Sequence, residues 1–272
     1  MTTASQSAVG NPAGLLAPDE PAPFKLVATS PRHPALLVCD HAAARIPQAL
    51  GTLGLPPAKL ADHIALDIGA GALTEQLVRR LAIPAVCTAY SRLVVDCNRR
   101  LDDPAAFPEA SDGVEVPGNV GLGHAKREQR AETLYWPYHH AVRNQLAGLE
   151  AHAAAPALIA IHSFTPAMSG LARPWQVGIL WDNDPRLPVP LIARLRQVPE
   201  LEVGDNEPYS GKHPADFTVD HHAEAEGLPH VGIEVRQDLI TTDEGVAHWA
   251  DILAEALRPI LDDPSLYVHW SG

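Results

Sequence analysis

Short, nearly continuous runs of apolar residues recur along the chain and give the first indication of its fold. They occupy residues 35–39, 84–88, 92–97, 157–162, 176–181 and 230–235. Most are rich in Val, Ile or Leu and lack the polar alternation of a half-exposed strand. We therefore expect strands that are buried on both faces of a sheet.

Between these runs, apolar residues recur with helical spacing. The pattern predicts helices over residues 68–81, 124–152, 189–197 and 243–261. In the last of them, Val246, Trp249 and Leu253 fall on one face, and Thr242 is placed to cap the first turn. Pro137 cannot donate an intrahelical hydrogen bond, so we expect it to kink or split the second helix.

The alternation of strands with helices indicates the fold class. It predicts a three-layer α/β domain, in which a mostly parallel or mixed sheet is flanked by helices. We expect this single domain to span residues 24–272, after a flexible N-terminal arm (residues 1–23) that is rich in Ala, Pro, Ser and Thr. Residues 100–123 and 198–222 lack a clear period, and we expect long loops there.

Polar residues of catalytic types follow three of the predicted strands. His41 comes directly after Asp40 at the end of one run, His162 and Ser163 end another, and Glu234 ends the last. The carboxyl ends of parallel strands meet at one edge of a sheet, where such folds bind ligands. Two histidines and a glutamate at that edge suggest a divalent metal ion beside a general base.

Each of these residues also has a purely structural interpretation. A lone histidine at a strand end can be a core residue bound to a carbonyl group. Glu234 could simply pair with Arg236, and an aspartate before a helix, such as Asp67, can be only a helix cap. Their joint occurrence favours the functional interpretation.

Charge and composition exclude several classes of partner. The formal net charge is −13, and Lys and Arg form no cluster, so nucleic acid is not an expected partner. No apolar stretch approaches the ~20 residues that span a bilayer, so no membrane is expected. Three cysteines without a Cys-x-x-Cys pair, and no secretory signal, predict a cytoplasmic location. An anionic substrate would need a local positive pocket, for which Arg92, Arg99 and Arg236 are candidates.

A series of motifs resembles the N-formylglutamate amidohydrolase family from about residue 35 to about residue 240. They are Cys39-Asp40-His41-Ala42 with Arg45-Ile46-Pro47, Asp67-Ile68-Gly69-Ala70, Ser91-Arg92-Leu93-Val94-Val95-Asp96-Cys97-Asn98-Arg99, Pro117-Gly118-Asn119, Ile161-His162-Ser163-Phe164, Asn206-Glu207-Pro208-Tyr209-Ser210 and Glu234-Val235-Arg236-Gln237-Asp238-Leu239. Each motif alone would be weak, but their number and order make the resemblance specific.

The resemblance implies a zinc-exopeptidase-like (phosphorylase/hydrolase-like) fold, distantly similar to the zinc carboxypeptidases. In those enzymes a His-Ser strand end supplies a zinc ligand, similar here to His162-Ser163. An Asp-x-Asn-Arg strand end grips the substrate carboxylate, similar here to Asp96, Asn98 and Arg99. A late strand-end glutamate acts as the general base, similar here to Glu234.

One departure from that pattern concerns the metal ligands. The carboxypeptidases supply their first two ligands from His-x-x-Glu, whereas Ala44 lies three residues after His41 and cannot bind metal. Catalytic zinc usually has three protein ligands and an open position for water. We expect Asp67 to complete the set with His41 and His162. Asp40 is the second choice, or a partner that orients a ligand histidine, because neighbouring side chains on a strand diverge. A metal-free site is a further interpretation.

The predicted reaction is hydrolysis of an N-acyl amino acid, in particular an N-formyl amino acid such as N-formylglutamate, to the amino acid and formate. Glu234 would take the proton of a zinc-bound water and deliver it to the leaving amine. Arg92 or Arg236, with the metal, would stabilise the oxyanion. Asn98 and Arg99 would orient the α-carboxylate. Zinc is the expected ion, with iron, manganese or cobalt as alternatives.

Several assignments stay open at this point. Tyr209 could cover the substrate, and His222 could enter the site from the same loop. The chain could also be a carboxypeptidase-like enzyme or another N-acyl-amino-acid or peptide amidohydrolase on the same scaffold, or a non-catalytic carboxylate-binding protein. The sequence does not decide between a monomer and a homo-oligomer.

Overall fold

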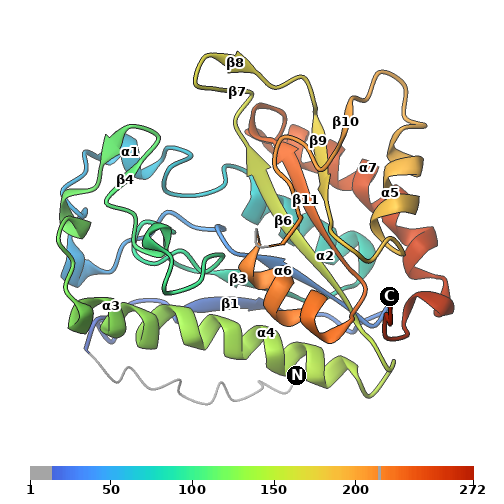
Figure 1. Cartoon of the computed structure of the whole chain (residues 1–272), viewed down its shortest axis with the longest axis horizontal. Helices are drawn as coiled ribbons and strands as arrows, with labels where there is room; N and C mark the ends of the chain where they lie inside the picture. Colours follow the sequence, from blue (N-terminus) through green and yellow to red (C-terminus); the bar gives the residue numbers. More distant parts are fainter. Residues whose placement is uncertain (1–13, 214–215) are drawn as a thin grey trace.

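The structure is a computed structural model that describes residues 14–213 and 216–272. A sheet of seven strands forms its centre (Figure 1). From one edge to the other the strands are β1 (Phe24–Val27), β3 (Ala85–Thr88), β2 (Ala35–Cys39), β6 (Ala157–Phe164), β11 (His230–Arg236), β9 (Val177–Leu180) and β10 (Val203–Asp205). Five of the six predicted strands are therefore confirmed, and the α/β class with them.

The sheet is mixed. β2 runs parallel to β3 and β6, and β6 runs parallel to β11. β1 is antiparallel at one edge, while β9 is antiparallel to β11 and carries β10 parallel to itself. The carboxyl ends of β2, β6 and β11 thus share one edge of the sheet with the amino end of β9.

The predicted strand over residues 92–97 is wrong, because this segment folds into buried turns. Leu93, Val94 and Val95 are buried, as a strand would require. However, the Ser91 hydroxyl accepts a hydrogen bond from the amide of Leu93, and the Asp96 carboxylate accepts one from the amide of Asn98. Side chains that bind nearby backbone in this way favour turns over a ladder of strand hydrogen bonds.

Helices cover both faces of the sheet (Figure 1). One face carries α2 (Ala70–Leu81), α5 (Pro188–Leu195) and α7 (Asp243–Leu261), and the other carries α3 (His124–Arg130), α4 (Trp136–Leu149) and α6 (Phe217–His222). The remaining short elements are α1 (Pro57–Leu60), β4 (Ala110–Ser111), β5 (Val114–Glu115), β7 (Ala167–Met168) and β8 (Leu171–Ala172). Within the described residues, no helix combines the length and hydrophobicity needed to cross a bilayer.

The helix predictions hold with local adjustments. Thr242 caps α7, since its hydroxyl accepts a hydrogen bond from the amide of Gly245 at 3.1 Å. The long segment 124–152 is split as expected, but by a turn of π-helix over Ala131–Tyr135 that precedes Pro137. Residues 198–222, expected as a loop, also contain β10 and α6.

Part of the expected N-terminal arm packs on the domain. Leu15 and Leu16 are buried against the core beneath α4, and the Glu20 carboxylate accepts hydrogen bonds from two backbone amides. Apolar contacts of Leu15 and Leu16 therefore attach this segment to the domain. Residues 1–13 lie outside the described part of the chain.

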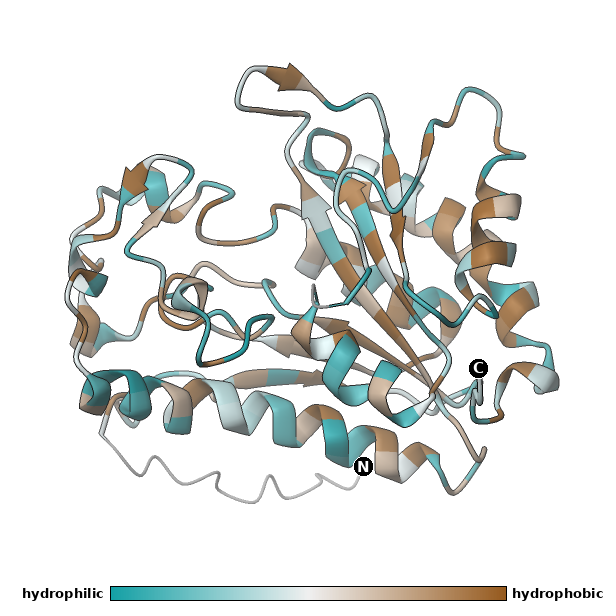
Figure 2. Ribbon diagram, viewed as in Figure 1, coloured by the Kyte–Doolittle hydropathy of each residue, from teal (hydrophilic) through white to brown (hydrophobic). Residues whose placement is uncertain are grey.

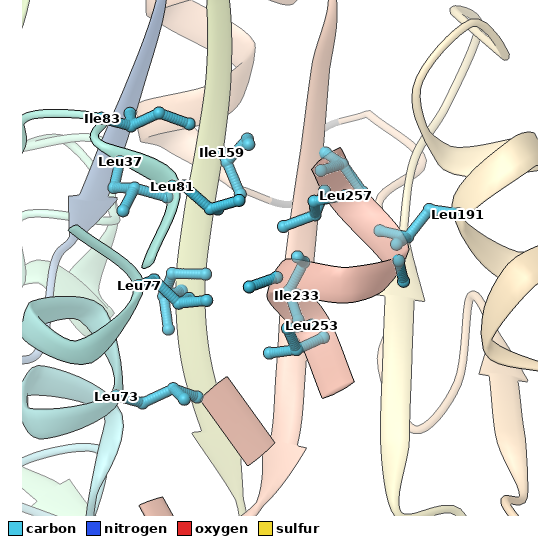
Figure 3. Close-up of a cluster of buried hydrophobic side chains, with 14 of the residues drawn as sticks. Leu37, Leu73, Leu77, Leu81, Ile83, Ile159, Leu191, Ile233, Leu253 and Leu257 are labelled. Carbon is cyan, nitrogen blue, oxygen red and sulfur yellow. The ribbon is translucent and has the colours of Figure 1, made fainter. Parts of the chain in front are cut away.

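Alternation along the central strands separates two faces with different contents. Ile159 of β6 and Ile233 of β11 point towards α2 and α7, where Figure 3 shows them among leucines of those helices. Leu158 and Ala160 point to the opposite face, towards α4. By the period of two, His162 also belongs to the α4 face. Figure 2 shows the hydrophobic strands at the centre of the molecule and hydrophilic loops at their ends.

Candidate active site

Strand register places His162 and Glu234 side by side. β6 and β11 are parallel, and the Cα atoms of these two residues are register partners. Side chains of register partners in a parallel pair point to the same face, so both lie on the α4 side near the carboxyl end of the sheet. Two residues distant in sequence thereby enter one buried site, with His162 4% and Glu234 7% exposed.

Asp67 connects the two strand-end histidines. Its Oδ2 lies 3.2 Å from Nδ1 of His41 and 2.8 Å from Nδ1 of His162. Asp67 is held there by its own amide, which donates to the carbonyl of His41 at 3.0 Å. Gly69, at φ +81°, then leads into α2; a Cβ atom at this position would lie 2.2 Å from the carbonyl oxygen of Ile240. Only glycine permits such a close approach of two backbones.

A separate carboxylate faces the outer nitrogen of each histidine. Nε2 of His41 donates to Oδ1 of Asp96 at 2.7 Å, and Nε2 of His162 lies 3.4 Å from Oδ2 of Asp40. The other oxygen of Asp40 accepts hydrogen bonds from the hydroxyls of Tyr138 and Thr218, both at 2.7 Å. His41 is thus hydrogen-bonded between Asp96 and the shared Asp67, whereas Nε2 of His162 and Oδ2 of Asp40 face each other without a hydrogen bond.

The histidines and the carboxylates of the site stabilise one another's charged forms. Burial alone would lower the pKa of both imidazoles, yet Asp67 with Asp96 raises the pKa of His41, and Asp40 with Asp67 raises the pKa of His162. Burial likewise would raise the pKa of Asp67, but the two imidazoles hold it well below its usual range. Without a metal ion, the surrounding carboxylates therefore favour the protonated form of both imidazoles.

Arg92 completes this set of charges. Its guanidinium donates to Asp96 at 2.7 Å and to the second oxygen of Asp67 at 3.4 Å. These carboxylates outweigh the effect of burial and raise the pKa of Arg92, so it remains a cation. Its side chain is 27% exposed, which leaves part of it open towards solvent.

Within the described residues, Glu234 forms no ion pair, unlike Asp67 and Asp96, which contact Arg92 and a histidine. Burial raises its pKa to about 7. Its Oε2 atom is buried and accepts no hydrogen bond from the described residues. A buried carboxylate that is costly to ionise and has a free oxygen is suited to take up and release a proton near neutral pH.

The group of His41, Asp67 and His162 fits a divalent metal ion. One ligand atom from each residue lies within 4.8 Å of the others, and all three residues are buried. Both imidazoles turn the same ring nitrogen, Nδ1, to one carboxylate oxygen, and their Nε2 atoms face outer carboxylates, the arrangement that commonly orients metal-ligating histidines. Two imidazoles and a carboxylate are a usual donor set for zinc.

Three further residues of the sequence prediction lie around this group. Ser163 donates its hydroxyl to the carbonyl of Ile68, in the turn between Asp67 and α2. The Asn98 side chain accepts a hydrogen bond from the amide of Thr218 at 3.0 Å, and so joins the turn after residue 97 to α6. Arg99 is half-buried, and its charge helps to lower the pKa of Asp96.

The other predicted residues, Arg236, Tyr209 and His222, make their contacts outside this cluster. Arg236 pairs with Asp238 at 2.8 Å, and Tyr209 is 39% exposed in the loop after β10. His222 is buried against His139, with 2.9 Å between Nε2 and Nδ1. The structure thus brings His41, Asp67, His162, Glu234 and Arg92 into one cluster, while His222 contacts a second histidine.

Two residues near the site were not identified from the sequence. Asp216 caps α6, and its Oδ2 lies 3.8 Å from Nε2 of His162. Arg173 precedes β9, and its guanidinium lies 5.9 Å from the ring centroid of Phe164. Neither residue lies in a predicted element or an apolar run. The start of α6 places Asp216 near the site, and the antiparallel course of β9 places Arg173 there.

The fold is of the α/β class, and comparisons with known proteins specify the family and, with it, a hydrolase that acts on amide bonds. The N-formylglutamate amidohydrolase family model matches residues 33–241, and the chain belongs to this family. No curated protein matches the chain significantly in sequence.

Two solved structures resemble the chain over most of its length. A gene product of Agrobacterium tumefaciens, Atu2144, is 36% identical, with a TM-score of 0.86; the match covers 91% of this chain and 98% of that one. An N-formylglutamate amidohydrolase from Ralstonia eutropha JMP134 is 20% identical, with a TM-score of 0.66, over 89% of this chain and 97% of that one. The second likeness concerns the fold alone.

Proposed function

We propose that the protein is a metal-dependent deformylase that hydrolyses an N-formyl amino acid, such as N-formylglutamate, to the amino acid and formate. The observation that carries the proposal is the convergence of two imidazoles on one oxygen of Asp67, beside Glu234 with its raised pKa. Family membership supports the reaction type, and the donor set supports zinc.

His41, Asp67 and His162 would hold the ion. When bound, zinc would lower the pKa of a coordinated water towards ~7 and polarise the formyl oxygen. Asp96 would keep the ring of His41 in position through its hydrogen bond, and Asp40 faces the outer nitrogen of His162. Asp96, expected from the resemblance to help grip the substrate, thus has a direct role in holding His41.

Glu234 would transfer the proton in this reaction. Its carboxylate takes a proton from water as the water oxygen attacks the formyl carbon. The same proton then passes to the amine nitrogen as the C–N bond breaks, so the products are formate and the free amino acid. A pKa of about 7 lets one group accept and release the proton at neutral pH.

Arginines and amides would position the charged parts of the substrate. Arg92 contacts two carboxylates of the ion-binding group, so we assign it to the oxyanion, with Arg236 as the second candidate. Asn98 and Arg99 remain our candidates for the α-carboxylate, since they follow Asp96 and Cys97 in the same turn. A small anionic amino-acid derivative is the substrate class, and a cytoplasmic location remains a prediction.

Formate release from N-formylglutamate by the purified protein tests the proposal. Activity should disappear on chelation and return with zinc. Glu234→Gln should keep its metal but lose turnover by about 10²–10⁴-fold, because it cannot accept the proton. Glu255→Gln, on the exposed face of α7, is the matched control and should remain active.

Other outcomes would reject parts of the proposal. Near wild-type turnover by Glu234→Gln would show that another group is the base. Cleavage of longer N-acyl or dipeptide substrates without formate release would favour a different amidohydrolase. Absence of both stoichiometric metal and hydrolysis would leave only a carboxylate-binding protein.

A further inference from the structure

Arg173 lies at the edge of the sheet that carries the carboxyl ends of β6 and β11. Because β9 is antiparallel to β11, the segment that leads into β9 arrives where β6 and β11 end. Phe164 and Arg236 are register partners, each two residues beyond His162 and Glu234 and on the same face. The Arg173 guanidinium carbon lies 5.9 Å from the ring centroid of Phe164, and the Arg173 carbonyl accepts from Arg236 at 3.4 Å.

The guanidinium of Arg173 is fixed by neutral groups. Its Nη1 donates to the Tyr209 hydroxyl at 3.0 Å and to the Thr165 hydroxyl at 3.1 Å. The guanidinium carbon also lies 4.8 Å from the ring centroid of Tyr209, in cation–π contact. Its Nη2 lies 2.8 Å from the sulfur of Met168. These contacts orient the charge without neutralising it.

An acidic partner distinguishes Arg92 and Arg236 from Arg173. Arg92 is shared by Asp67 and Asp96, and Arg236 pairs with Asp238. Over residues 14–213 and 216–272, Arg173 forms no ion pair with a carboxylate, although the chain carries a net charge of −13. A half-buried, oriented cation in so acidic a protein is suited to an anion from outside the chain.

Two glycines bring Tyr209 and its loop to this position. Gly178 of β9 is the register partner of Glu234, and a Cβ atom there would lie 2.1 Å from the carbonyl oxygen of Glu207. At Gly204 of β10 the corresponding distance is 2.5 Å. The loop after β10 therefore packs directly on the sheet beside Glu234, and Tyr209 can hold Arg173 at the margin of the same site.

We propose that Arg173 binds the second carboxylate of an acidic N-formyl amino acid, held in place by Tyr209 and Thr165, and so determines the preference for acidic side chains. This inference rests on the proposed deformylase function. The α-carboxylate and the distal carboxylate then contact separate cations, Arg99 and Arg173. Planar guanidinium groups bind carboxylates in bidentate fashion, so this arrangement selects a dianion over a neutral substrate of equal size.

The test compares N-formylglutamate with N-formylglutamine, which matches it in size but lacks the distal charge. In Arg173→Gln, kcat/KM for N-formylglutamate should fall roughly 30-fold, mainly through KM, while N-formylglutamine changes less than about 2-fold. Arg173→Lys should recover part of the preference. Arg79→Gln, exposed in the last turn of α2 and about 14 Å along the helix from its start, is the charge-matched control and should behave as wild type.

Equal losses on both substrates would overturn the inference, because they would indicate a structural role, and so would an unchanged preference. Calorimetry of the zinc-loaded protein gives a test independent of turnover and of the variant's folding. Wild-type protein should bind glutarate at least about 10-fold more tightly than pentanoate, and equal affinities would also overturn the inference. If glutarate is preferred through Arg173 but no formate is released from either substrate, the proposed function fails and the anion site stands.

Discussion

Two buried histidine pairs in this molecule have the same spacing and opposite electrostatics. Ring centroids lie 5.2 Å apart both in His41–His162 and in His139–His222. The pKa of each histidine is raised in the first pair. In the second pair burial lowers the pKa of His139 to about 4 and that of His222 to about 3.

The partners of each pair account for the difference. The first pair lies among Asp40, Asp67 and Asp96, whose charges offset the effect of burial. In the second pair, Nε2 of His139 donates to the carbonyl of Cys97, so its Nδ1 must accept from His222. Proximity of two buried imidazoles therefore does not by itself favour positive charge. The carboxylates around the first pair favour it, because they raise the pKa of both histidines.

The largest effect should come from removing a histidine of the first pair. His162→Asn should lose stoichiometric zinc and reduce formate release by about 10³-fold or more. The substitution removes a ligand of the ion and also changes the surroundings of Glu234, the register partner of residue 162. Elemental analysis and a formate assay on the same preparation check this. Full metal content with full activity would remove His162 from the ion-binding group.

A smaller effect is expected from the outer carboxylates of the first pair. Asp96→Asn leaves the ring of His41 in place but weakens its hydrogen bond, so zinc affinity should fall about 10–100-fold. Competition with a chelator of known affinity measures the change. Asp102→Asn, whose carboxylate pairs with Arg100 on the surface, is the matched control and should leave the affinity unaltered.

Breaking the second pair should affect stability instead of metal content. His222→Phe keeps an aromatic ring but leaves Nδ1 of His139 buried without a donor. The free energy of unfolding should fall by about 1–3 kcal/mol, as measured by chemical denaturation. If zinc content also dropped, the two pairs would not be as independent as their contacts indicate.

The smallest effect concerns pH. His139 and His222 take up protons in the unfolded chain near 6.5 but in the folded protein only near 4 and 3. Their contribution to stability is therefore complete above pH 6.5 and is lost as the pH falls towards 4. His222→Phe should reduce the slope of stability against pH between 6.5 and 5.5 by about 1 kcal/mol per pH unit. An unchanged slope would mean that His222 is not buried in its neutral form.

Much of the scaffold could be predicted because the information is local. Val231 and Ile233 belong to a short, mostly apolar run, and such a run becomes a buried strand wherever it lies in the sheet. The segment 92–97 shows the limit of this reasoning. Its hydrophobicity predicts burial correctly, but the side chains of Ser91 and Asp96 determine that the backbone turns.

The sequence by itself determined the class of fold, the family, and the residue types at the ends of β2, β6 and β11, because strand period and motif order are properties of the chain alone. Only the tertiary structure decided which groups meet. In the structure Asp67 contacts both histidines of the site, and His222 contacts His139. The antiparallel course of β9 places Arg173 at the edge of the sheet where β6 and β11 end. The physical reason is that the charge of a buried group depends on neighbours that are distant in sequence, and strand order and register determine those neighbours.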